Sequence, residues 1–144
     1  MAIDAAAGLA GGCQCGAVRY RLMAEPTGAN ICHCRMCQKA SGGPFTAFGD
    51  VRLSEFVITS GAIATFSSSD IAKRGFCARC GTPLTYEGLG SDHISVTLGS
   101  LDNPGRAPNA AWSLINGQLA YPFTKPARDS HRAMANEEED RGRP

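Results

Sequence analysis

Cysteine is the residue type in this chain that is best suited to chemistry. The seven cysteines fall into three clusters: Cys13 and Cys15; Cys32, Cys34 and Cys37; and Cys77 and Cys80. An odd number of cysteines cannot all be paired in disulfides within one chain. No export signal is visible, so we expect a cytoplasmic protein in a reducing compartment, where thiols bind metals rather than each other.

Spacing divides the cysteines between two expected metal sites. The segment Cys77-Ala78-Arg79-Cys80-Gly81 has the form of a zinc knuckle, with two thiolates on either side of a tight turn. A structural zinc needs four ligands, and the cluster at Cys13 and Cys15 supplies the missing pair, because residues two apart on a strand share a face. The middle cluster then keeps three thiolates for a second zinc. A zinc with three protein ligands leaves its fourth position open for water or substrate, as catalytic zinc sites do.

Alternatives remain open for the middle cluster. His33 would close the site as a fourth ligand, and both zinc ions would then be structural. In an extended segment, however, its side chain points away from the face that Cys32 and Cys34 share. An iron–sulfur cluster is a further alternative, although the spacing does not match the common ferredoxin patterns.

Length, composition and charge exclude several classes. The 144 residues, with 43% hydrophobic and 19% charged residues, suit one globular domain. A net charge of +1 lacks the basic excess that nucleic-acid binding requires. No apolar run reaches the length needed to span a membrane. We expect a flexible lead-in over residues 1–11, a single zinc-binding domain over 12–124 and a solvated tail over 125–144.

Alternation of apolar and polar residues predicts a mainly β fold with little helix. Val18, Tyr20 and Leu22 share one predicted strand face within Ala17–Leu22. The other predicted strands are Phe45–Phe48 and Val51–Ile58 around a turn at Gly49-Asp50, Ala62–Phe66, Ile71–Phe76, Leu84–Glu87, His93–Leu98, and a hairpin of Trp112–Ile115 with Gln118–Tyr121. One short helical turn is predicted over Gln38–Ser41, before Gly42.

Three motifs in order resemble a known family. They are Gly12-Cys13-Gln14-Cys15-Gly16-Ala17-Val18-Arg19-Tyr20, then Cys32-His33-Cys34-Arg35-Met36-Cys37-Gln38-Lys39-Ala40-Ser41-Gly42, and Phe76-Cys77-Ala78-Arg79-Cys80-Gly81-Thr82, with a weaker match over Gly99–Pro104. Together they resemble the glutathione-dependent formaldehyde-activating enzyme family, also called the centromere-protein-V-like family. The resemblance implies twisted, folded-over antiparallel sheets stitched together by a structural zinc. It also implies two zinc ions per chain, the structural one on Cys13, Cys15, Cys77 and Cys80 and the catalytic one on Cys32, Cys34 and Cys37.

The family resemblance implies a carbon–sulfur lyase. Its reaction forms or cleaves a thiol–aldehyde adduct of the S-hydroxymethylglutathione type, so the expected partners are a small-molecule thiol and an aldehyde, with glutathione as a candidate co-substrate. Arg35 and Lys39 are candidates to offset the charge of a three-thiolate zinc or to bind a substrate carboxylate, and Ser41 is a candidate hydrogen-bond donor. His93 is expected at a surface or edge, and Trp112 in the core.

One segment departs from the family pattern, and two other functions compete with the lyase. Many family members carry a histidine with an aromatic residue near the C-terminus, whereas Pro108–Trp112 contains no histidine here. This departure predicts a substrate pocket that differs from that of those members. The first competing function is a non-catalytic zinc-binding module that contacts a protein partner. The second is a thiol-binding or metal-handling protein without turnover. No oligomeric state is predicted.

Overall fold

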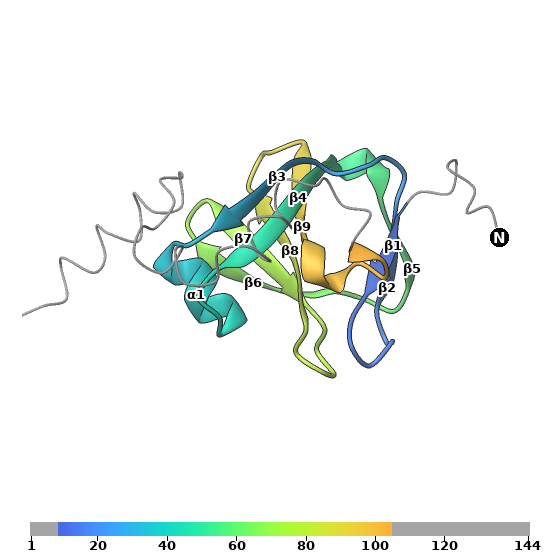
Figure 1. Ribbon diagram of the computed structural model, residues 1–144, viewed down its shortest axis with the longest axis horizontal. Coiled ribbons are helices and arrows are strands. Elements are labelled where there is room, and N and C mark those ends of the chain that lie inside the picture. Colours follow the sequence, from blue (N-terminus) through green and yellow to red (C-terminus); the bar gives the residue numbers. More distant parts are fainter. Residues whose placement is uncertain (1–8, 105–144) are drawn as a thin grey trace, which may run out of the picture.

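Two antiparallel sheets make up most of the described part of the protein. A computed structural model describes residues 9–104 (Figure 1). The smaller sheet has the order β1 (Ala10–Gly12), β2 (Arg19–Leu22), β5 (Phe56–Ser60). The larger sheet has the order β3 (Thr27–Cys32), β4 (Thr46–Arg52), β9 (His93–Thr97), β8 (Pro83–Gly88), β7 (Ala72–Phe76), β6 (Ala64–Ser69). Every pair of neighbouring strands is antiparallel. The predicted mainly β fold class is confirmed.

The larger of two hydrophobic cores joins the smaller sheet to the larger one. Successive side chains of a strand point to opposite faces, so the alternating positions of β2 and β9 bury one face each. Tyr20 and Leu22 come from β2, and Ile94 and Val96 come from β9. Fully burying one such aliphatic side chain contributes about 1.5–3 kcal/mol. The buried members are Leu9, Cys13, Val18, Tyr20, Leu22, Val51, Cys77, Leu84, Ile94, Val96, Leu98 and Leu101.

The second core lies beside the one α-helix that the described residues contain, α1 (Arg35–Ser41). It buries Phe48, Ala72 and Tyr86 together with the three cysteines of the middle cluster. The helix begins three residues before the predicted turn and ends at Gly42, whose φ of 70° lies in the left-handed region that glycine tolerates. The larger core thus includes Cys13 and Cys77, and the second core includes Cys32, Cys34 and Cys37.

The turn predicted at Gly49-Asp50 is wrong, because β4 runs straight through it. Gly49 is buried, and a Cβ placed there would lie 2.6 Å from Cβ of Pro26 and 2.9 Å from Cδ2 of Leu98. The glycine serves close packing rather than chain reversal. The chain instead leaves β4 through a 3-10 turn, η1 (Leu53–Glu55), and then enters β5.

The first strand, β1, begins inside the segment predicted as a lead-in, residues 1–11. Leu9 is buried, and its carbonyl accepts a hydrogen bond from the backbone N–H of Leu22 at 2.7 Å. β1 therefore includes residues that the sequence analysis assigned to the lead-in. The predicted hairpin at Trp112–Tyr121, the departure at Pro108–Trp112 and the predicted tail lie outside the described residues. Between residues 9 and 104, no helix is long and apolar enough to cross a membrane.

The segment after β9, a strand of the larger sheet, contacts the smaller sheet. It forms a 3-10 turn, η2 (Leu98–Ser100), and Leu101 then pairs with Gly11 of β1. The hydroxyls of Tyr20 and Ser100 are hydrogen-bonded at 2.7 Å, and burial raises the pKa of Tyr20 to about 12. The Arg19 guanidinium donates to both carboxylate oxygens of Asp102, which holds the pKa of that carboxyl below its usual value.

We expect Asp102→Asn to lower the free energy of unfolding by no more than about 1 kcal/mol at pH 7, as is usual for partly exposed ion pairs. The Arg19 and Asp102 side chains are 35% and 48% exposed. Because the folded-state pKa of Asp102 is depressed, its contribution is fully present above the unfolded value of about 3.9 and is lost only below it. Between pH 7.5 and pH 5, protons compete with metal for the thiolates and lower the free energy of unfolding. This loss should be the same in the wild type and in Asp102→Asn.

Urea unfolding of the zinc-loaded protein at each pH checks this expectation. A difference between the two proteins that closes before pH 5 would contradict the assignment of the Asp102 carboxylate as a low-pKa partner of Arg19.

Candidate metal centres

Four cysteines from distant parts of the chain meet where the β1–β2 loop faces the β7–β8 loop. The sulfur atoms of Cys13, Cys15, Cys77 and Cys80 all lie within 4.8 Å of one another. The Sγ of Cys15 lies 3.6 Å from that of Cys13 and 3.8 Å from that of Cys77. The structure therefore brings together the two pairs that the spacing combined into one expected site.

Two glycines shape the turns that present these sulfurs. Gly16 and Gly81 both have a φ of 79°, in the left-handed region where a side chain is strained. The backbone N–H of Gly16 donates to the carbonyl of Cys13 at 3.2 Å, and that of Gly81 donates to the carbonyl of Cys77 at 2.8 Å. Each turn thus aims two thiols at the same point, which explains why a glycine follows each cysteine pair.

Hydrogen bonds favour negative charge on this four-sulfur group, but mutual repulsion opposes it. The backbone N–H of Val18 lies 3.2 Å from Cys13 Sγ and lowers its pKa. The hydroxyl and backbone N–H of Thr82 lower the pKa of Cys80 to about 5. The N–H of Ala17 also lowers the pKa of Cys15, yet desolvation and the three neighbouring thiols outweigh it and raise the pKa to about 11. Four thiolates need a cation between them, so this donor set fits a metal ion.

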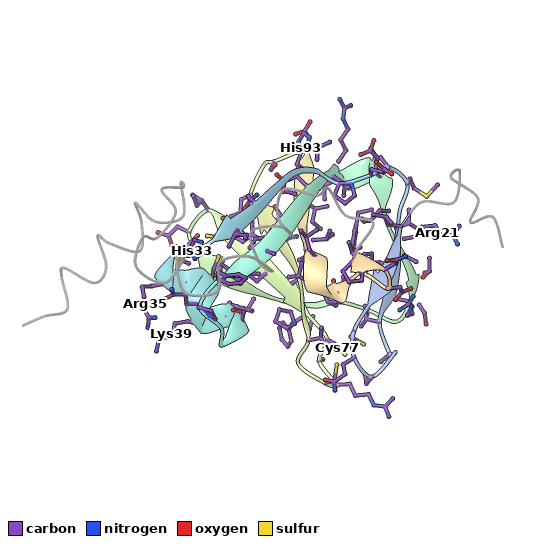
Figure 2. The ribbon with its side chains drawn as sticks, viewed as in Figure 1. Arg21, His33, Arg35, Lys39, Cys77 and His93 are labelled. Atoms are coloured by element: carbon purple, nitrogen blue, oxygen red, sulfur yellow. The ribbon has the colours of Figure 1, made fainter. Side chains whose placement is uncertain are left out.

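The other three cysteines form a separate, buried group at α1. Cys32 ends β3, Cys34 caps the helix and Cys37 lies in its first turn. Their sulfur atoms lie within 4.8 Å of one another, and the backbone N–H of Cys37 lies 3.4 Å from Cys34 Sγ. Figure 2 shows α1, with Arg35 and Lys39, well away from Cys77. The two cysteine groups are therefore distinct sites.

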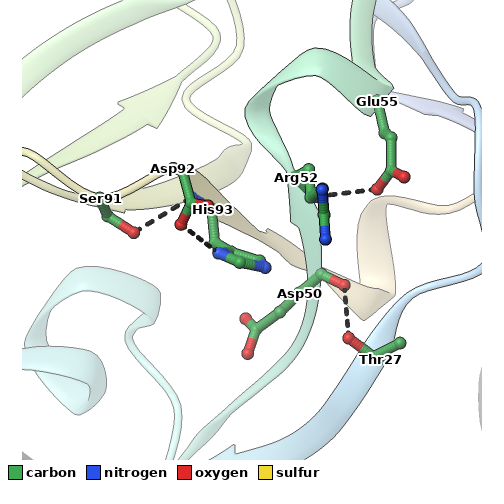
Figure 3. Close-up of polar contacts among 7 residues, drawn as sticks. All are labelled: Thr27, Asp50, Arg52, Glu55, Ser91, Asp92 and His93. Carbon is green, nitrogen blue, oxygen red and sulfur yellow. Dashed lines mark hydrogen bonds and ion pairs between the residues drawn. The ribbon is translucent and has the colours of Figure 1, made fainter.

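Neither described histidine belongs to a cysteine group. The three-sulfur group does not include His33, whose ring packs edge-on against Phe45 with 5.6 Å between centroids. Desolvation lowers the pKa of His33. His93 is exposed, as predicted, and its Nδ1 lies 2.6 Å from a carboxylate oxygen of Asp92 (Figure 3). Within residues 9–104, the middle group is thus a set of three thiols.

Arg74 is a site residue that the sequence analysis missed. Its guanidinium is buried, donates to Cys37 Sγ at 3.3 Å and lies 5.0 Å from the centroid of the Tyr86 ring. Contact with Cys32 lowers the pKa of Cys37, but the Cys34 sulfur and burial raise it more, and Arg74 offsets part of that rise. The position of Arg74 in the strand could have revealed it. Arg74 lies two residues after Ala72 on the inward face of β7, where a buried cation needs a partner.

A cavity of about 250 Å³ lies beside the three-sulfur group, and Arg74 is part of its wall. An outer hollow of about 310 Å³ shares Ala40, Phe66 and Arg74 with this cavity and is also lined by Lys39. Ser41 lines the inner cavity, but its hydroxyl donates to the carbonyl of Cys37 at 3.0 Å.

The remaining predicted substrate residue lies further out. Arg35 donates to the side chain of Gln38 at 2.7 Å and lines a third hollow, which also includes Lys39. Of the three predicted substrate residues, Ser41 therefore reaches the inner cavity, Lys39 the outer hollow, and Arg35 only the third hollow.

Fold and site together define a small, mainly β domain in which two groups of thiols can each hold a metal ion. The family model described as glutathione-dependent formaldehyde-activating enzyme matches residues 8–114. The chain belongs to this family, which confirms the resemblance drawn from the three motifs.

Individual relatives agree with this assignment. A protein of Schizosaccharomyces pombe named as an uncharacterised lyase is 32% identical over 76 residues, covering 53% of this chain and 55% of its own. A protein of Halomonas elongata, provisionally named as a glutathione-dependent formaldehyde-activating enzyme, is 33% identical over 84 residues, covering 53% of this chain and 54% of its own. The matches thus span about half the length of these relatives.

A solved structure supports the fold. A crystal structure of a Rhodobacter sphaeroides protein has a TM-score of 0.55 at 24% identity, covering 69% of this chain and 92% of that one.

Proposed function

We propose that this chain is a zinc-dependent carbon–sulfur lyase that forms or cleaves a thiol–aldehyde adduct of the S-hydroxymethylglutathione type. Cys13, Cys15, Cys77 and Cys80 would hold a structural zinc, and Cys32, Cys34 and Cys37 a catalytic one. The observation that carries the proposal is the buried group of three thiols, which shares Arg74 with a substrate-sized cavity. A ligand set of three leaves one position for a reactant.

The reaction needs a reactive sulfur and a polarised carbonyl. The thiol sulfur adds to the aldehyde carbon, a carbon–sulfur bond forms, and the thiol proton ends on the former carbonyl oxygen; cleavage is the reverse. A zinc ion held by the three thiolates would supply Lewis acidity and a means of keeping a sulfur deprotonated at neutral pH. Free thiols have a pKa near 8.5 and are only a few per cent ionised there.

The chain's own residues keep this ligand set in place and compensate its charge. Zinc with three thiolates carries a net charge of −1, and the buried guanidinium of Arg74 lies against one of the sulfurs. The hydroxyls of Ser41 and Thr46 both donate to the carbonyl of Cys37, at 3.0 and 3.2 Å, and fix the helix turn that carries it. Lys39 lines the outer hollow, and we expect it to pair with a carboxylate of the thiol substrate.

Turnover of glutathione with formaldehyde tests the proposal. We expect the zinc-loaded protein to accelerate exchange between free glutathione and its hydroxymethyl adduct, measured by NMR exchange spectroscopy at equilibrium. Protein in which both sites are filled, but which accelerates exchange for no aldehyde with glutathione or other small thiols, would contradict a lyase function.

Replacing Arg74 should weaken the metal site without unfolding the protein. We expect Arg74→Met to reduce zinc affinity at the three-thiol site, or turnover, by about 10–100-fold, as is usual when an outer partner of a metal ligand is lost. Lys73→Met is the matched control, because Lys73 directly precedes Arg74 in β7 and forms an ion pair with Glu87 at 3.3 Å instead. Competition with a chromophoric chelator measures the affinity. Equal losses in both variants would contradict the role of Arg74.

A non-catalytic zinc module is the second candidate. The edge strand β5 leaves Val57 and Ile58 42% and 45% exposed, one on each face, and an edge strand with exposed apolar side chains suits a protein partner. Such a module has no need for an exchangeable position at the second metal.

A further inference from the structure

The cavity beside the three-sulfur group is far larger than formaldehyde requires. Its volume of about 250 Å³ exceeds the roughly 150 Å³ that holds a benzene molecule in an apolar protein core. Formaldehyde has only two heavy atoms and is comparable with a water molecule, which takes up about 30 Å³. The hydroxymethyl group that formaldehyde contributes to the adduct would by itself leave most of this space unfilled.

Aromatic side chains supply much of the lining of the cavity. Three aromatic rings line it, from Phe48 on β4, Phe66 on β6 and Phe76 on β7. Phe66 and Phe76 meet edge to face with 6.0 Å between centroids, and Phe66 is 48% exposed, which places it at the mouth. Aromatic side chains of this kind favour offset or edge-on contact with another ring.

Three of the four hydroxyls that line the cavity are already engaged with the protein, the exception being that of Thr85. Those of Ser41 and Thr46 donate to the carbonyl of Cys37, and that of Thr97 donates to the carbonyl of Pro83 at 2.9 Å. Their hydrogens are therefore not offered to a ligand. The charged group in the wall is Arg74, at the end where it contacts Cys37. An apolar pocket with a polar group at one end orients a ligand that has the same polarity.

We propose that this cavity binds an apolar group about the size of a phenyl ring, carried by the aldehyde half of the adduct. Its polar end faces Arg74 and Cys37, and the charged thiol half lies in the outer hollow beside Lys39. The choice of the aldehyde as carrier rests on the proposed lyase function, whereas the size and polarity of the ligand rest on the cavity alone. An aromatic aldehyde is then a better substrate than formaldehyde.

Binding of benzyl alcohol, which is unreactive, tests the cavity without turnover. In a titration of the ¹⁵N-labelled, zinc-loaded full-length protein, we expect saturable shifts of the amides of residues such as Ala40, Gly75 and Thr85, which line the cavity. Ala40→Phe fills the space from α1 and should weaken binding about tenfold or more, on the scale of losing a matched apolar contact. Ala62→Phe, at an exposed position outside the cavity, is the matched control and should bind as the wild type does.

A second variant keeps the test decisive if Ala40→Phe fails to fold. Phe66→Ala removes a ring at the mouth and should also weaken binding. Absence of saturable shifts in the wild type overturns the proposal. Equal binding by the wild type, Ala40→Phe and Phe66→Ala overturns it as well.

Turnover separates failure of the cavity from failure of the lyase. With glutathione, we expect kcat/KM for benzaldehyde to exceed that for formaldehyde by about tenfold, and Ala40→Phe to lower this ratio. A formaldehyde preference with a ratio unchanged by Ala40→Phe overturns the inference and leaves the lyase standing. Turnover of no aldehyde, together with saturable benzyl alcohol binding, overturns the lyase and supports the ligand class of the cavity.

Discussion

Replacement of Cys77 by serine is expected to unfold the domain. Cys77 is 1% exposed and directly follows β7, the strand that brings the β7–β8 loop against the β1–β2 loop. Cys15 and Cys77 are 62 positions apart in sequence, so a metal ion that joined them would close a long loop. A structural zinc contributes about 10–16 kcal/mol in apparent binding free energy, whereas a whole domain is stable by only about 5–15 kcal/mol. Loss of the site therefore removes most of the stability.

Far-UV circular dichroism and urea unfolding of Cys77→Ser in the presence of zinc measure this effect. Ala78→Ser introduces the same hydroxyl at the next, exposed position and removes no ligand, so it should unfold as the wild type does. A Cys77→Ser protein with a cooperative transition near that of the wild type would show that the four-sulfur group does not hold the fold together.

Replacement of Cys37 by serine is expected to abolish turnover while the domain stays folded. Cys37 and Cys77 are both 1% exposed. Cys37→Ser and Cys77→Ser therefore make the same change at equally buried positions. The three-sulfur group lies within one short segment, from the end of β3 to α1, so a metal ion bound there would close no long loop of chain. We expect a cost of about 1–3 kcal/mol from the altered buried group. Turnover should fall by about 100-fold or more, since a ligand matters more than its outer partners.

Stability and activity measured on the two variants decide whether the cysteines divide their roles. Unfolding of both proteins to the same extent would remove the distinction between a structural and a catalytic site. Full turnover by Cys37→Ser would show that the reaction occurs elsewhere.

The cysteine groups could be predicted from sequence because their geometry is local. In Cys-x-Cys before Gly16 and in Cys-x-x-Cys before Gly81, the turn alone brings two sulfurs together. Because a structural zinc needs four ligands, the two pairs are then expected to share one site. The strands β2 and β9 were predictable for a similar reason, because their alternation reflects one buried face. Only the relative position of these local units had to come from the fold.

What sequence reasoning missed depends on contacts between distant residues. Gly49 resembles a turn residue, yet its role is to let Pro26 and Leu98 approach the backbone of β4. Arg74 resembles an ordinary strand cation, yet the fold buries it against Cys37 from a different part of the chain. The lining of the cavity likewise combines β4, β6, β7 and α1. No local pattern encodes such meetings.

The number of zinc ions per chain tests the central claim most directly. Freshly purified, reduced protein would be measured by native mass spectrometry after equilibration with excess zinc, beside Cys37→Ser. We predict two zinc ions in the wild type and one in Cys37→Ser, because the three-thiol site loses a ligand while the four-thiol site is unchanged. One zinc ion retained by the wild type in excess zinc would contradict an open catalytic site and would favour the non-catalytic module.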